Sequence, residues 1–164
     1  MNKKKIFIAV DTNKISIAKR IIRDTQTNKI KIGYKFGLEF FYSKEGRKFI
    51  SRLKNQTIFL DLKLNDIPNT VRSAMKSLKD LKISYLTVHL SSGLNALKAL
   101  KQESKNIKIA GVTTLTSFND KDLKEIGYNK KVNELVKHQA KLATKAKLDA
   151  IVCSGHEILS LIHI

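Results

Sequence analysis

The sequence is poor in cysteine and in acidic residues, and it has no long hydrophobic run. Its single cysteine, Cys153, excludes an internal disulfide and a cysteine-based zinc site, which favours a reducing compartment. The apolar run at residues 6–10 is too short for a signal peptide or a membrane span, because Asp11 interrupts it. We therefore expect a cytoplasmic protein that does not contact a membrane.

The shortage of acids leaves a formal net charge of +18, with 32 Lys and Arg against 14 Asp and Glu. The lysines are spread from Lys3 to Lys147 and form no single block. No basic patch interleaved with aromatic residues is present, and no known nucleic-acid-binding motif. We expect a solvated basic surface and no nucleic-acid partner, with a basic nucleic-acid-binding remnant as the alternative from a different functional class.

Short apolar runs alternate with longer polar stretches whose apolar residues fall at helical spacing. This pattern predicts six strands, each followed by helical sequence, near residues 6–10, 30–34, 57–62, 85–89, 107–113 and 150–153. The helix after the third strand has the clearest pattern, with Pro68 near its first turn and Asp66 placed to cap or precede it. One apolar face of this helix is marked by Val71, Ala74, Met75, Leu78 and Leu81.

Alternating strands and helices imply a mostly parallel sheet, either open and doubly wound or closed into a TIM (β/α)8 barrel. No glycine-rich phosphate loop follows the first strand, which disfavours the open dinucleotide-binding type. Polar residues follow or end many strands, as in a barrel: Asp11, Lys35, Lys63, His89, Thr116 and Ser154. We expect an α/β TIM barrel with only about six of eight units, covering residues 1–158, and a non-native tail at 159–164.

The strand at residues 57–62 continues into a charged segment. Alternation places Leu60, Leu62 and Leu64 on one face and Phe59, Asp61 and Lys63 on the other. A buried ion pair is costly to desolvate, which favours a functional role over a structural pair at the barrel mouth. Asp66 follows nearby, and a lysine between acids keeps its proton. Lys63 therefore suits a general acid or an electrostatic partner for developing negative charge.

Other candidate residues are ambiguous when taken alone. Asp11 fits a turn, and His89 fits a hydrogen-bonded core histidine better than a catalytic one. Lys31 and Lys35 share a face of the second strand region, and alternation does not decide which one reaches the site. Thr116 and its neighbour Ser117 fit a helix cap near Phe118. No His, Cys and carboxylate grouping has metal-ligand spacing, so we expect no metal.

The segment Phe59–Thr70, with the sequence FLDLKLNDIPNT, resembles the signature of orotidine 5'-phosphate decarboxylases. Asn65 stands where the bacterial pattern usually has histidine. Further matches follow in the order of the family: Ala9–Asp11, Ile30–Gly33, Val88–His89, Val112–Ser117 and Val152–Ser154 with Glu157. The resemblance covers nearly the whole chain up to about residue 158.

The resemblance implies a cofactor-free TIM-barrel homodimer that converts orotidine 5'-phosphate to UMP in de novo pyrimidine synthesis. It selects Lys31 over Lys35 as the lysine of a charged tetrad with Asp61, Lys63 and Asp66, in which Lys63 donates the proton. Asp66 and Thr70 are implied to reach the partner subunit's site. The implied substrate-binding residues are Asp11, which binds the ribose, together with Lys31, Asp61, Ile67, Thr70 and Thr116.

Two parts of the family pattern are absent from these 164 residues: the Pro-Gly-Ile-Arg phosphate segment and the closing Gly-Arg. Without these groups we expect phosphate affinity to collapse and this chain alone to be inactive or insoluble. The nearest alternative is a magnesium-dependent sugar-phosphate decarboxylase or aldolase of the same superfamily. Those enzymes resemble this chain at Asp61, Lys63 and Asp66, but they carry a glutamate in place of Lys31 and lack Ile-Pro-Asn-Thr.

Overall fold

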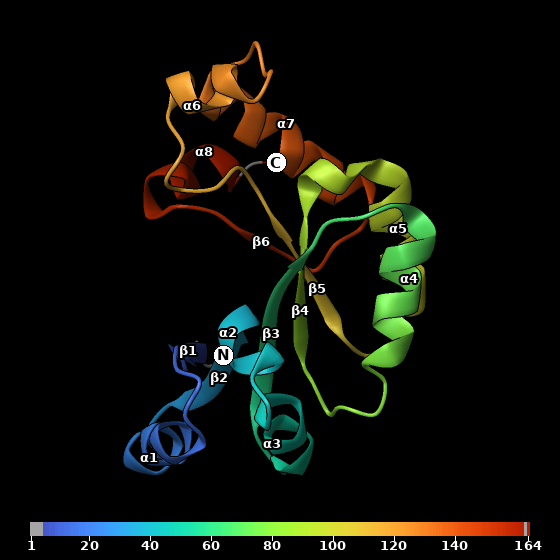
Figure 1. Cartoon of the computed structure of the whole chain (residues 1–164). Coiled ribbons are helices and arrows are strands. Elements are labelled where there is room, and N and C mark those ends of the chain that lie inside the picture. The colour runs from blue at the N-terminus through green and yellow to red at the C-terminus, as the bar shows by residue number, and fades with distance from the viewer. Residues whose placement is uncertain (1–4, 163) are drawn as a thin grey trace. The chain divides into compact units, whose positions relative to one another are not determined.

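The computed structural model describes residues 5–162 and 164, and it alternates strands and helices along the chain as expected (Figure 1). The six strands are β1 (Lys5–Ala9), β2 (Lys31–Gly37), β3 (Thr57–Leu64), β4 (Tyr85–His89), β5 (Lys108–Val112) and β6 (Ala150–Val152). They are hydrogen-bonded in sequence order. The pairs β1·β2, β2·β3 and β5·β6 are parallel, which requires the crossover connections that the helices supply.

The helices between the strands are mostly short. They are α1 (Ile15–Asp24), α2 (Leu38–Tyr42), α3 (Gly46–Arg52), α4 (Pro68–Ser77), α5 (Gly93–Glu103), α6 (Asp120–Glu125), α7 (Val132–Lys145) and α8 (Ile158–Leu161), with 3-10 turns η1 (Leu90–Ser92) and η2 (Gly155–Glu157). The helix expected after the third strand is α4, in which Val71 and Met75 are buried. The expected boundary at residue 158 stays a prediction, and residues 1–4 and 163 lie outside the described part.

The strand limits agree with the alternation pattern to within one residue, except at two carboxyl ends. β2 runs three residues past its expected end, to Gly37, and β3 runs two residues further, to Leu64. The cause in β2 is that Tyr34 and Phe36 continue one buried face, while Lys35 between them points to the other face and breaks the apolar run. Lys35 and Lys63 therefore lie within strands.

The chain divides into two compact units. The first comprises residues up to Leu62 with Ser77–Leu86, and the second comprises Lys63–Lys76 with the residues from Thr87 onward. In the first unit, Tyr34 is buried and its hydroxyl donates a hydrogen bond to the Ile22 carbonyl in α1, 3.1 Å away. Buried apolar residues lie in both units, such as Phe36 and Ile58 in the first and Leu97 and Val136 in the second.

Aromatic rings hold the first unit together on both faces of its sheet. On one face, the Phe36 ring contacts Phe40 of α2 and Phe49 of α3, with centroids 4.9 and 6.5 Å away. On the other face, the Phe7 ring lies 5.1 Å from the Phe59 ring and 5.2 Å from the Tyr85 ring, both edge-on. Edge-to-face pairs of this kind add to the free energy gained by burying the rings.

Gly33 of β2 makes room for the second aromatic group. A Cβ at this position would lie 2.6 Å from Phe7 Cε1 and 3.0 Å from the Thr57 carbonyl oxygen. The Phe7 ring therefore occupies the space that a side chain on β2 would need. Glycine is required here for close packing, whereas its backbone freedom plays no part.

Asp149 joins three elements of the second unit. Its Oδ2 accepts hydrogen bonds from the backbone N–H of Ile109 in β5, 2.7 Å away, and from Lys101 Nζ in α5. The residue immediately precedes β6. Burial alone would raise its pKa, but the Lys101 and Ile109 hydrogen bonds, with the charges of Lys101 and Lys108, hold the pKa below its ordinary value.

Replacing Gly33 with alanine should destabilise the protein by about 1–3 kcal/mol, because the new methyl group collides with the Phe7 ring. The measurement is urea unfolding followed by circular dichroism. Gly155→Ala is the matched control, since a Cβ at Gly155 meets nothing within 4 Å. Equal losses of stability in the two variants would contradict this packing.

The lowered pKa of Asp149 predicts a pH-dependent contribution to stability. The group stabilises the fold above its ordinary pKa, and this contribution is lost as the pH falls through the lowered pKa of the folded state. Asp149→Asn should therefore be less stable than the parent at pH 7, with a difference that shrinks on acidification. Urea unfolding at a series of pH values measures this, and a difference independent of pH would contradict it.

Candidate functional site

The first unit brings together three charged residues that come from three neighbouring strands. Asp11 follows β1, Lys35 lies in β2 and Asp61 lies in β3. Lys35 Nζ is 3.5 Å from Asp61 Oδ2 and 3.8 Å from Asp11 Oδ1. The parallel register explains the meeting, since Lys35 pairs with Ala9 while Gly37 pairs with Asp61. A lysine ammonium therefore sits between two carboxylates at the carboxyl ends of these strands.

The three charges differ in their exposure to water. The Asp61 side chain is 14% exposed and that of Lys35 28%, whereas the Asp11 side chain is 69% exposed. On β3, Phe59 precedes Asp61 by two residues and belongs to the Phe7–Phe59–Tyr85 ring group. An aromatic layer therefore lies next to the charged cluster along the strands. Because the Lys35–Asp61 pair is partly buried, salt screens it less than it would screen a fully exposed pair.

Lys31 does not lie in this cluster. It is the first residue of β2, where it is exposed and pairs in register with Lys5. Lys35 lies four residue steps further along β2, a distance of roughly 13 Å at the usual rise per residue. The structure thus brings Lys35, and not Lys31, to Asp61. Face alternation fixes the face of a residue but not its height along the strand, so it could not predict this.

Lys63, the last residue but one of β3, has an unusual backbone conformation. Its φ is +48°, in the left-handed region that lysine rarely adopts. Such a conformation costs on the order of 1–3 kcal/mol, and residues of this kind cluster at functional sites. Its backbone N–H donates a hydrogen bond to the hydroxyl of Thr87 in β4, 2.8 Å away. This bond lies within the second unit.

Residues 65–70, which follow Lys63, are all exposed. Asp66 precedes α4, and its Oδ1 accepts a hydrogen bond from the Ile67 N–H at 2.7 Å. Ile67 itself is 66% exposed. Thr70 lies exposed in the first turn of α4. The segment carrying three expected site residues is therefore open to a further molecule.

The second unit also holds a small pocket of about 210 Å³ at the carboxyl ends of β4 and β5. His89, the last residue of β4, and Thr113 line it, together with the buried Gln139 of α7. Gln139 Oε1 accepts hydrogen bonds from the Thr114 N–H at 2.7 Å and from the Thr114 hydroxyl at 3.1 Å. Sequence reasoning missed Gln139, since a lone glutamine in a helix carries no pattern.

Thr116 lies exposed on the loop after β5 and does not cap the following helix. The cap of α6 is Asn119, whose side chain accepts from the backbone of Lys121 and Asp122, while Asp122 accepts in return from the Asn119 N–H. This capping box is visible in the sequence, where Asn119 and Asp122 stand three residues apart. The loop position of Thr116 leaves its hydroxyl open to a ligand.

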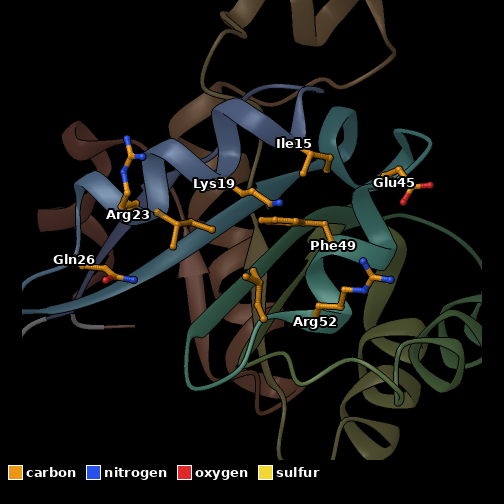
Figure 2. A pocket seen from close by; sticks show the side chains of 9 residues that line it. Ile15, Lys19, Arg23, Gln26, Glu45, Phe49 and Arg52 are labelled. Atoms are coloured by element: carbon orange, nitrogen blue, oxygen red, sulfur yellow. The ribbon is translucent and has the colours of Figure 1, made fainter.

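A larger pocket, of about 670 Å³, lies between α1 and α3 in the first unit (Figure 2). Lys19 and Arg23 of α1 and Phe49 and Arg52 of α3 are on its walls. None of the expected site residues lines it. Its one acidic residue, Glu45, forms an exposed ion pair with Lys48, 3.6 Å away, and the other lining residues are apolar, cationic or uncharged polar. We therefore do not take it as the candidate site for acid-base chemistry.

Other chemistries find little support among residues 5–162 and 164. No group of three or more His, Cys, Asp and Glu side chains in this part could hold a metal ion. Burial and, to a lesser degree, the charge of Glu157 raise the pKa of the Cys153 thiol, which keeps it protonated at neutral pH. No helix in the described part is long and apolar enough to cross a membrane.

The family model described as "Orotidine 5'-phosphate decarboxylase / HUMPS family" matches residues 4–162. The chain belongs to this family. It is 38% identical over 159 residues to an orotidine 5'-phosphate decarboxylase of Erythrobacter litoralis, covering 93% of this chain and 68% of that relative. It is 46% identical over 138 residues to the enzyme of that name from Bacillus mycoides, covering 77% of this chain and 58% of that relative.

The solved structures agree. The crystal structure of an orotidine 5'-phosphate decarboxylase from Lactobacillus acidophilus matches with a TM-score of 0.87 at 30% identity, covering 97% of this chain and 75% of that chain. A conserved protein of Geobacillus kaustophilus gives the same TM-score and identity. These matches confirm the expected TIM-barrel fold, of which this chain supplies six strands. The chain thus spans between about half and three quarters of the length of these relatives.

Proposed function

We propose that the protein containing this chain decarboxylates orotidine 5'-phosphate to UMP without a cofactor. The observation that carries the proposal is the position of Lys35 between Asp61 and Asp11, at the strand ends where TIM-barrel enzymes keep their active sites. The family match and the names of the relatives support the same activity. Lys35 takes the role in the charged tetrad that the sequence resemblance implied for Lys31.

The residues have complementary parts in this reaction. Loss of carbon dioxide leaves a carbanion at pyrimidine C6, which the Lys63 ammonium stabilises and then protonates. Asp61 stands beside the departing carboxylate, and the ion pair with Lys35 holds Asp61 in place. Asp11 binds the ribose, and Ile67, Thr70 and Thr116 contact the substrate. No residue in this scheme requires a metal ion.

The position of Lys35 also distinguishes this proposal from a magnesium-dependent sugar-phosphate enzyme. Such an enzyme needs an anionic ligand on β2 that faces Asp61. Here the side chain facing Asp61 is a lysine, 3.5 Å away. A cation at that place repels Mg²⁺, which prefers oxygen ligands.

We further propose a cytoplasmic homodimer in which Asp66 and Thr70 complete the partner's site. The support is the run of exposed residues at 65–70, with Ile67 66% exposed in the single chain. A symmetric dimer would cover this segment on both subunits at once.

The experiment on activity uses a completed protein, in which this chain is joined to the part of the Bacillus mycoides relative that follows the matched region. Orotidine 5'-phosphate turnover is followed by the change in ultraviolet absorbance. We expect turnover in the completed protein and none in the 164-residue chain alone. Lys35→Ala should lower kcat by about 100- to 1,000-fold, as loss of a preorganised group does, whereas Lys31→Ala should retain the parent kcat. The reverse order of the two lysines, or no turnover in the completed protein, would contradict the proposal.

Mixing two inactive variants of the completed protein tests the dimer. Lys63→Ala and Asp66→Ala each disable every site in their own homodimers. If Asp66 acts across the interface, mixed dimers contain one intact site, and an equal mixture should recover about a quarter of the parent activity. Sedimentation velocity checks that each variant is dimeric. If Asp66 acts within its own chain, the mixture stays inactive.

A further inference from the structure

We propose that Thr87 is a positioning residue that holds the backbone of Lys63 in its left-handed conformation. The inference rests on the proposed role of Lys63 as proton donor. Lys63 has a φ of +48°, and its backbone N–H donates to Thr87 Oγ1 at 2.8 Å. Thr87 is a polar residue with no exposed surface, in the middle of the buried strand β4.

The hydrogen bond between Lys63 and Thr87 differs from the backbone hydrogen bonds that pair the strands. Parallel strands normally pair through backbone groups, whereas here a side-chain oxygen accepts from the backbone of the neighbouring strand's end. A residue with positive φ directs its Cβ differently from its extended neighbours. The direction of the Lys63 side chain therefore depends on the hydrogen bond that fixes its peptide group.

A second bond fixes the same segment two residues later. The Ser92 hydroxyl, at the end of the turn η1 that follows β4, donates to Asn65 Oδ1 at 2.9 Å. Asn65 stands where the family pattern usually has histidine. The stretch between Lys63 and Asp66 is thus tied at two points to β4 and its turn, and Thr87 supplies the buried point.

A buried hydroxyl is a strong anchor because it cannot exchange its partner for water. Without it, the Lys63 N–H would lose its acceptor, and the strained φ would relax toward the extended region. The ammonium group would then be displaced from the reacting carbon. Displacing the proton donor slows the reaction, but it does not weaken the binding of remote parts of the substrate.

The kinetic test uses the completed protein. Thr87→Val should lower kcat by about 10- to 100-fold, with KM for orotidine 5'-phosphate within about threefold of the parent. Thr87→Ser, which keeps the hydroxyl, should restore most of kcat. Ser104→Ala is the matched control, because Ser104 is also buried and donates to the Lys101 carbonyl at the far end of α5. It should lose stability but keep kcat.

Amide hydrogen exchange at Lys63 supplies a readout independent of activity. In the parent protein this amide should exchange at least about tenfold more slowly than an exposed amide, and Thr87→Val should abolish the difference. A Lys63 amide that exchanges freely in the parent overturns the inference even if the variant does not fold. So does Thr87→Val with parental kcat. If the parent shows no turnover, the proposed function fails, and the exchange result alone decides the role of Thr87.

Discussion

The ion pair between Lys35 and Asp61 forms because the parallel pairing of β2 with β3 brings the two side chains together. Their Nζ and Oδ2 atoms are 3.5 Å apart, and both side chains are largely shielded from water. Two such charges cannot be half-buried without partners. The parallel register pairs Asp61 with Gly37, two residues beyond Lys35, so the long Lys35 side chain reaches along the strand to Asp61. Asp11 adds a second carboxylate from β1, which leaves the cluster with a net negative charge that suits a further cation.

The aromatic packing next to the cluster also shields the ion pair from water. Gly33 admits the Phe7 ring, and Phe7, Phe59 and Tyr85 contact one another on the face of β3 that carries Asp61. Apolar rings on one side limit how far water reaches the ion pair, which strengthens its field. The packing thus supplies a rigid strand face, and the charged cluster lies at the carboxyl ends of the strands, where TIM barrels carry their active sites.

Local sequence patterns predicted what depends on local geometry. The alternation in β3 gave the buried face of Leu60 and Leu62 and the opposite face of Asp61, and both are confirmed. Alternation could not choose between Lys31 and Lys35, because their heights are set by pairing with β1 and β3. The bond from Lys63 to Thr87 joins residues 24 positions apart, and nothing local marks Lys63 for a positive φ. Such features arise only when strands distant in sequence meet.

The most direct test of the account is a crystal structure of the completed protein with UMP bound. The account predicts Lys35 Nζ between Asp61 and Asp11, within ion-pair distance of Asp61, and Lys63 Nζ facing pyrimidine C6. Lys31 in the place of Lys35, or Lys63 directed away from the pyrimidine, would contradict it.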